Sequence, residues 1–265
     1  MAMHVESPGL ATDLALLELQ GSIIRDRGDH LVIRTPDNPT FWWGNFLLLE
    51  RAVPAAEIPG WIERFEQEFP GAHHQTFGFT DSVSDYSGWR EQGFDVECDV
   101  ALTAAKVPTW MPLDEDEISI RHFAERRDWR QAAELGASDA PIGELEARLV
   151  FEERRAAAQK ALVDDGRGAW FGAFVGERLV AKLGIVRLGT RARYQDVVTH
   201  HGYRRRGIAA RLVRVAGEWA LTDPDVRELV IVAAEGGPAI SLYERLGFEE
   251  SSRHIGVERA LAPEA

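Results

Sequence analysis

Cysteine is almost absent from this chain of 265 residues, which contains one, Cys98. A single cysteine excludes an intrachain disulfide, so the fold depends on its hydrophobic core. Cys98 alternates with acidic residues in the segment Val-Glu-Cys-Asp-Val, a pattern typical of a half-buried strand. No histidine lies near it in the sequence, so we interpret Cys98 as a structural residue and not as a nucleophile.

Basic residues and long hydrophobic runs are also scarce. The chain has 30 Lys and Arg against 43 Asp and Glu, a formal net charge of −13. Because nucleic-acid binding needs a basic face, we predict no nucleic-acid partner. No apolar run approaches the roughly 18 residues that span a membrane, and the first residues lack the basic and apolar regions of a signal peptide. We therefore expect a soluble, cytoplasmic protein without a membrane partner.

Hydrophobic residues make up 45% of the chain, enough for a core in one large domain or two ordinary ones. From Ile118 onward, apolar periodicity and turn residues predict one α/β unit, and we expect its last strand to close this unit. The expected strands are 118–121, 170–175, 179–188, 193–199, 228–234 and 248–259; the expected helices are 128–135, 144–163, one from about 207 that stops before 222–224, and 239–246.

The most informative segment joins the strand at 193–199 to the helix that follows, and reads Arg-Arg-Arg-Gly-Ile-Ala from Arg204 to Ala209. The first N–H groups of a helix have no intrahelical partner, and the helix dipole favours negative charge there. Gly207 lets a ligand approach the backbone because it lacks a Cβ, and three arginines supply donors for phosphate oxygens. The segment therefore predicts a site for a cofactor that carries a pyrophosphate.

This segment resembles the acyl-CoA loop of the GNAT superfamily of N-acyltransferases. The family motif is (Gln/Arg)-x-x-Gly-x-(Gly/Ala), and Arg204, Gly207 and Ala209 fill its defined positions. A second segment, from Ala239 to Phe248, is similar to the family's Ala-x-x-Leu-Tyr-x-x-x-Gly-Phe signature. Two motifs in order, with a helix and a buried strand between them, are more specific than either alone. The resemblance covers roughly 118–260 and implies an α/β (α+β) fold with a mixed, mostly antiparallel sheet flanked by helices.

The resemblance also implies acetyl-CoA as co-substrate. In the family, the pantetheine arm pairs with the strand before the loop, much as an added strand would. Backbone N–H groups of the loop and of the first helical turn hold the pyrophosphate. For the three arginine side chains alone, a solvated basic turn is the alternative. The implied cofactor-binding residues are Val197, Val198, Thr199, Arg204, Arg205, Arg206, Gly207, Ile208, Ala209 and Ala210.

Catalysis needs a proton donor and a proton acceptor. Tyr243 lies where the family keeps a general acid, and a tyrosine hydroxyl, with a pKa of about 10, can protonate the thiolate that leaves a thioester. A core tyrosine under the cofactor is the alternative. The family has no fixed base; Asp196 and Glu235 are our candidates, and His200 and His201 lie beside the loop. We predict no metal site, because no cluster of further ligands accompanies the adjacent histidines.

The N-terminal half repeats the pattern at an offset of 154 residues. Ser87-x-Trp89 followed by Gly-Phe echoes Ser241-x-Tyr243 followed by Gly-Phe, and an apolar stripe (Ile58, Trp61, Phe65) falls on the helix after the loop. We therefore predict two tandem copies, with a degenerate domain at 1–111 and a catalytic domain at 112–265. The first copy is expected to be shortened, without the first strand and the helices.

The N-terminal copy should not bind the cofactor. Val53 occupies the position of Gly207, and Pro54 after it has no N–H to donate. Trp89 replaces the tyrosine and removes its hydroxyl. We therefore interpret this copy as a non-catalytic pseudo-domain.

Together these features predict an N-acetyltransferase that moves an acetyl (acyl) group from acetyl-CoA to a primary amine of a small molecule or of a protein. Gly236 stands where the family often has an asparagine that bonds to the cofactor arm. A CoA-responsive binding or regulatory protein with little turnover is therefore the alternative. The acceptor and the choice between monomer and homodimer stay open.

Overall fold

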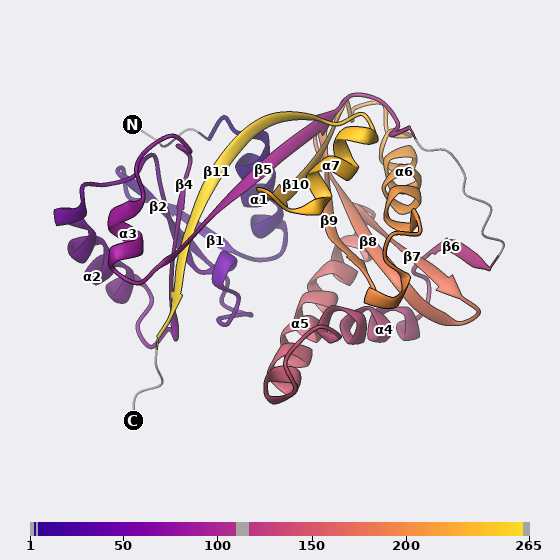
Figure 1. Ribbon diagram of the computed structural model, residues 1–265, viewed down its shortest axis with the longest axis horizontal. Helices are drawn as coiled ribbons and strands as arrows, with labels where there is room; N and C mark the ends of the chain where they lie inside the picture. Colours follow the sequence, from indigo (N-terminus) through magenta and orange to yellow (C-terminus); the bar gives the residue numbers. More distant parts are fainter. Residues whose placement is uncertain (1–2, 4, 110–116, 262–265) are drawn as a thin grey trace. The chain divides into compact units, whose positions relative to one another are not determined.

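The computed structural model describes residues 3, 5–109 and 117–261 (Figure 1). The described residues form two compact units. Unit 1 comprises residues up to Ala101 together with 232–240 and those from Glu250 on, and unit 2 comprises 102–231 and 241–249. The predicted domain boundary at 111/112 lies outside the described residues, so the division at that point stays a prediction.

Unit 2 contains five of the six strands predicted for the C-terminal half, the last of these five only as far as Ile231. The strand at 228–234 pairs parallel with the strand at 191–199, and all other neighbouring strands of this unit pair antiparallel. The Gly-Glu turn at 176–177 joins the central hairpin, as its turn chemistry predicts. In spatial order the strands are β10 (Glu228–Ala234), β9 (Arg191–Thr199), β8 (Arg178–Leu188), β7 (Gly168–Val175) and β6 (Ile118–His122).

The predicted helices are present as well: α4 (Arg126–Ala137), α5 (Leu145–Asp164), α6 (Ile208–Ala220) and α7 (Pro238–Arg245), with short 3-10 turns at Ile142–Glu144 and His201–Tyr203. Small residues on the buried face of α6 bring this helix close to the sheet; the buried residues are Ile208, Ala210, Leu212, Val213, Ala216, Gly217 and Ala220. A Cβ on Gly217 would lie 2.5 Å from the hydroxyl of Tyr194. That hydroxyl donates a hydrogen bond to the carbonyl of Val213 over 2.8 Å.

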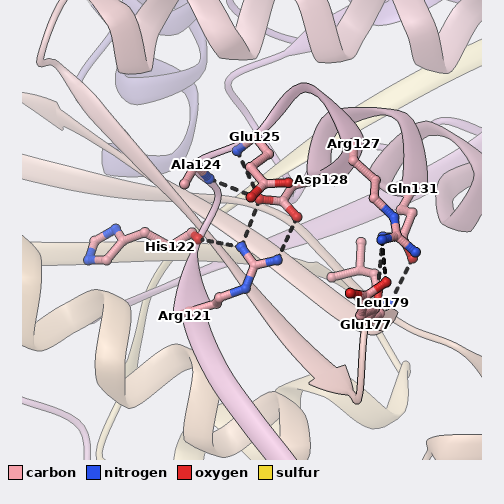
Figure 2. A network of polar contacts seen from close by, with 9 residues as sticks. All are labelled: Arg121, His122, Ala124, Glu125, Arg127, Asp128, Gln131, Glu177 and Leu179. Atoms are coloured by element: carbon pink, nitrogen blue, oxygen red, sulfur yellow. Dashed lines mark hydrogen bonds and ion pairs between the residues drawn. The ribbon is translucent and has the colours of Figure 1, made fainter.

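A polar network fixes the start of α4 (Figure 2). The guanidinium of Arg121 donates two hydrogen bonds of 2.7 Å to the carboxylate of Asp128, which also accepts from the N–H groups of Ala124 (2.9 Å) and Glu125 (3.1 Å). A side-chain amide of Gln131 then donates to the carbonyl of Glu177 and its oxygen accepts from the N–H of Leu179. α4 is thereby tied to β6 and to the β7–β8 hairpin.

Unit 1 repeats the same connections. β2 (His30–Arg34) pairs antiparallel with β3 (Phe46–Leu49), and β3 pairs parallel with β4 (His74–Phe79) after a crossover through α2 (Ile58–Glu68). β8, β9 and β10 have the same pairings around α6. The three stripe residues of α2 are buried, as the 154-residue offset predicts. Its elements are α1 (Pro8–Leu19), β1 (Ile23–Asp26), β2 (His30–Arg34), β3 (Phe46–Leu49), α2 (Ile58–Glu68), β4 (His74–Phe79), α3 (Ser87–Glu91) and β5 (Asp95–Ala104), with 3-10 turns at Trp42–Gly44 and Ala55–Glu57.

Two expectations for the sheet and its flanking helices are wrong. The N-terminal copy does have a leading helix, α1, whereas we expected no helix before its strands. β1 pairs with β2 as β7 pairs with β8, so among the described residues this copy has no counterpart of β6, as expected. Also, β11 (Glu249–Ala260) does not close the C-terminal unit: it pairs antiparallel with β4, from Ile255 opposite Phe79 to Ala260 opposite His74. The physical reason is that a strand's own alternation shows which of its faces is buried but not which strand it will pair with.

Candidate functional site

An open strand edge lies on β9 where this strand leaves β10. The parallel pairing of the two strands covers three positions and ends at Arg193 opposite Val230, although β9 continues to Thr199. Among the described residues, β9 beyond Arg193 therefore has no strand partner on that side. Unpaired N–H and C=O groups of a strand edge can pair with an extended ligand. The half-buried residues Val197, Val198 and Thr199, predicted to bind the cofactor, follow this point.

A β-bulge accompanies the departure of β9 from β10. Lys182 lies opposite Val198, but Gly184 lies opposite Gln195, so two residues of β9 face one residue of β8. One of these two, Asp196, has a φ of 56°, in the left-handed region. Bulges bend a strand and increase its local twist. The bend therefore coincides with the free edge.

The loop after β9 has a backbone suited to anions. Arg205 (φ 63°) and Gly207 (φ 72°) are both in the left-handed region, and Gly207 is the N-cap of α6. Left-handed residues that alternate with others turn successive N–H groups into one concavity, a known anion-binding arrangement. The first backbone bond of α6 runs from the N–H of Arg211 to the carbonyl of Gly207 (3.1 Å). The N–H groups of the first turn, from Ile208 to Ala210, precede that bond and carry the positive end of the helix dipole.

Two of the three arginines of this loop also contact other residues of the protein. The guanidinium of Arg204 donates to the carbonyl of Thr199 (3.0 Å) and pairs with Asp139 (2.5 Å), yet its side chain is 53% exposed. The guanidinium of Arg206 lies 5.4 Å from the ring centre of Tyr203. These contacts brace the loop, so the predicted anion site depends more on the backbone than on these two side chains.

Tyr243, on α7, is buried, with 4% of its surface exposed, and its ring packs near Phe248. Burial raises the pKa of Tyr243 to about 12, while the positive charge of Arg193 acts in the opposite direction. The hydroxyl is therefore protonated at neutral pH, as a proton donor must be. In the N-terminal copy, Trp89 at the same position packs its ring among Phe77, Phe79 and Phe94.

Asp196 has surroundings that differ from those of a general base. Its side chain is 2% exposed, and its carboxylate lies 2.6 Å from Nζ of Lys182 and 3.1 Å from a guanidinium nitrogen of Arg155. Burial alone would raise its pKa, but the charges of Arg155 and Lys182 outweigh burial and lower the pKa of Asp196 to about 2. A carboxylate held by two cations accepts a proton poorly, so this geometry argues for a structural role.

The remaining base candidates are more accessible. Glu235 has a 49% exposed side chain that pairs with Arg253, and it belongs to unit 1, whereas Tyr243 belongs to unit 2. The rings of His200 and His201 are stacked with centroids 4.4 Å apart, directly before the loop. Burial, followed by the charge of His201, lowers the pKa of His200, so its imidazole is neutral at pH 7.

The sequence did not lead us to the cations around Asp196, although one signal was visible. Lys182 is a lone charge inside the otherwise apolar stretch from Leu179 to Val186, and a charge there must be paired if the strand is buried. Within the described ranges, no group of three or more His, Cys, Asp or Glu side chains is arranged to hold a metal ion. None of the helices described for this chain has the length and apolar character needed to cross a membrane.

Comparison with known proteins finds one family model that matches part of the chain and solved structures that share its fold. Residues 125–248 match the model of the Acetyltransferase (GNAT) family, a segment that includes the loop and Tyr243. No curated protein matches the chain.

Solved structures extend the likeness to the whole chain. A functionally unknown conserved protein from Staphylococcus epidermidis has a TM-score of 0.70 at 14% identity, over 98% of this chain and 96% of that one. A GCN5-related N-acetyltransferase from Kribbella flavida has a TM-score of 0.65 at 15% identity, over 96% of both chains. A tandem GNAT protein from the clavulanic acid biosynthesis pathway has a TM-score of 0.55 at 14% identity, over 100% of this chain and 99% of that one. The likeness shows the mixed α/β fold and its two copies.

Proposed function

We propose that this chain, whose residues 125–248 match the model of the Acetyltransferase (GNAT) family, transfers an acetyl group from acetyl-CoA to a primary amine. The observation that carries the proposal is the loop backbone, where two left-handed residues at 205 and 207 precede the N-terminus of α6. This loop directly follows a strand with a free edge. An anion cradle beside a strand edge matches the two chemistries of CoA, a pyrophosphate and an amide-containing arm.

The cofactor would bind mainly through the backbone. The N–H groups from Arg205 to Ala210 would surround the pyrophosphate, with the dipole of α6 adding to their field. The β9 edge at Val197, Val198 and Thr199 would pair with the amides of the pantetheine arm. Arg204 would add charge from the side if a phosphate displaced its contact with Asp139.

The reaction requires two proton movements. The neutral amine nitrogen attacks the thioester carbon, a C–N bond forms and the C–S bond breaks. The departing sulfur takes the proton of the Tyr243 hydroxyl, and solvent returns a proton to the tyrosinate. The amine gives its extra proton to a base, for which His200 is the accessible candidate within unit 2; Glu235 stays a candidate from the sequence alone. The products are an N-acetyl amine and CoA thiol. A small-molecule amine and a protein amine are both compatible acceptors.

The test measures CoA binding by calorimetry and thiol release from acetyl-CoA across a panel of amines. We expect wild-type binding and turnover, and a loss of CoA affinity of about tenfold or more in Gly207→Val, because a β-branched residue resists the left-handed conformation. Gly189→Val is the matched control, since Gly189 is also left-handed (φ 64°) but lies in the β8–β9 turn. It should lower stability and keep CoA affinity. Unchanged affinity in Gly207→Val would sink the assignment, and tight binding without turnover on any amine would favour a CoA-responsive regulator.

A further inference from the structure

A cluster of four charges, three of them buried and one half-buried, lies beside the bulge of β9. We call it the ion cluster; its members are Glu152 and Arg155 of α5, Lys182 of β8 and Asp196 of β9. Lys182 lies between the two carboxylates, 2.6 Å from Asp196 and 3.8 Å from Glu152. Arg148 of α5 also pairs with Glu152 at 3.0 Å from the more exposed side, so each carboxylate has at least two cationic partners. The cluster joins one helix to two strands within unit 2.

The protein packs tightly around this cluster. A Cβ on Gly136 would lie 2.4 Å from the carboxylate of Glu152, so α4 needs a glycine where it passes α5. Buried charges tolerate little displacement, because each one must keep its partners to offset lost hydration. The ion cluster therefore fixes the position of every backbone segment that contributes to it.

The direction of the Asp196 side chain explains why β9 has a bulge. Tyr194 of β9 reaches α6 through its hydrogen bond to the carbonyl of Val213, whereas Asp196, two residues later, reaches Arg155 of α5. In a regular strand, residues two apart share one face. The extra residue resets this alternation and lets the carboxylate join the ion cluster. Aspartate is also among the few side chains that tolerate a left-handed backbone.

We propose that the ion cluster is a positioning device for the acetyl-CoA site, in which Lys182 and Arg155 hold Asp196 so that β9 bulges and bends away from β10. The inference rests on the proposed function. The bend begins where the pairing with β10 ends, at Arg193. It thereby sets the direction of the free edge at Val197, Val198 and Thr199. Asp196 and Lys182 act through this backbone and do not touch the reacting atoms.

Two charge-matched double variants test the proposal: Lys182→Met with Asp196→Asn, and Lys182→Met with Asp196→Val. Each removes one cation and one anion, but asparagine tolerates the left-handed conformation and valine does not. We expect the asparagine variant to keep CoA affinity within about threefold and the valine variant to lose about tenfold or more, because small misplacements of a binding edge are costly. The KM for acetyl-CoA should rise in the valine variant with kcat nearly unchanged. Equal affinities in the two variants would overturn the proposal.

A second buried carboxylate serves as a control that distinguishes a specific effect on the β9 edge from a general loss of protein stability. Asp128→Asn removes a carboxylate in the same unit that also pairs with an arginine; it should lower the unfolding temperature without changing CoA affinity. Equal loss of affinity in Asp128→Asn and the valine variant would contradict the inference. If the unaltered chain does not bind CoA, the proposed function fails, and amide hydrogen exchange decides the positioning role separately. Faster exchange from Val197 to His200 in the valine variant alone supports it, and equal exchange in both variants overturns it.

Discussion

At the scale of single residues, burial gives Tyr243 the protonation state that its proposed role requires. A phenol whose pKa is about 12 keeps its proton far above neutral pH. A raised pKa also makes it a weaker acid, so its usefulness depends on the basicity of the leaving thiolate at the moment the C–S bond breaks. The charge of Arg193 opposes the effect of burial and would stabilise a transient tyrosinate.

Removing this hydroxyl should affect chemistry and not binding. We expect Tyr243→Phe to lower kcat by about a hundredfold with CoA affinity unchanged, measured by thiol release and calorimetry. Because the pKa is raised, the tyrosine should cause no fall in wild-type kcat below about pH 10. Trp89→Tyr is the control in the other copy, where a hydroxyl should add no activity. A wild-type rate in Tyr243→Phe would return Tyr243 to a packing role.

The lowered pKa of Asp128 predicts how the stability of the protein changes at low pH. Its side chain is 1% exposed, and hydrogen bonds from Arg121 outweigh the opposing effect of burial and lower its pKa to about 2. A lowered folded-state pKa stabilises the protein above the unfolded value near 4, and this contribution disappears as pH falls from about 4 to about 2. Asp128→Asn should therefore lower the free energy of unfolding by about 2 kcal/mol at neutral pH. It should also make the loss of stability between about pH 4 and pH 2 less steep. Asp196 shifts in the same direction, so part of the slope should remain. Urea unfolding at a series of pH values measures both effects. An unchanged pH dependence of stability in Asp128→Asn would contradict a lowered pKa of Asp128.

At the scale of helices and strands, the sequence predicts most elements because their signals are local. The stripe of α2 and the apolar run of β10 were recognisable from their own residues. α1 was missed because its leucines are spread around the helix, so no apolar face was visible. The bulge was missed because aspartate is common in ordinary strands and loops, and only the cations around Asp196, contributed by other elements, fix its backbone.

The contact between α6 and the sheet gives the next prediction. A Cβ on Gly217 would lie 2.5 Å from the hydroxyl of Tyr194 and 3.1 Å from Leu229, so Gly217→Ala must push α6 outward. We expect a loss of about 1–3 kcal/mol and weaker CoA binding, because α6 carries the loop. Gly60→Ala in α2 is the matched control, since nothing lies within 4 Å of its added Cβ; helix propensity should make it neutral or stabilising by up to about 1 kcal/mol. Calorimetry and thermal unfolding measure the pair, and equal effects would exclude close packing as the cause.

At the scale of the whole molecule, the two copies share connections but not a binding loop. Among the described residues, the only non-glycine residues with positive φ are Asp196 and Arg205, both in the second copy. The corresponding loop of the first copy has Val53 and Pro54 and no such backbone. Within the part of the chain that the structure describes, the copy whose tyrosine position holds Trp89 thus has neither the left-handed loop backbone nor a register shift between β2 and β3. The sequence comparison predicted the missing loop, whereas the missing bulge became visible only in the backbone conformation.

The chain's last strand connects the two halves of the sequence. Val257 of β11 is fully buried, lies opposite Phe77 of β4 and belongs to the core formed by α2, α3 and β4. Val257→Asp would bury an unpaired carboxylate and should cost about 3 kcal/mol or more. Because β11 pairs in unit 1, hydrogen exchange should show lost protection in β4 first, with β8 still protected. If β11 instead stabilised the C-terminal unit, as its place in the sequence suggests, protection would be lost from β9 and β10 before β4. The order in which the strands lose protection therefore shows whether β11 stabilises unit 1 or the C-terminal unit.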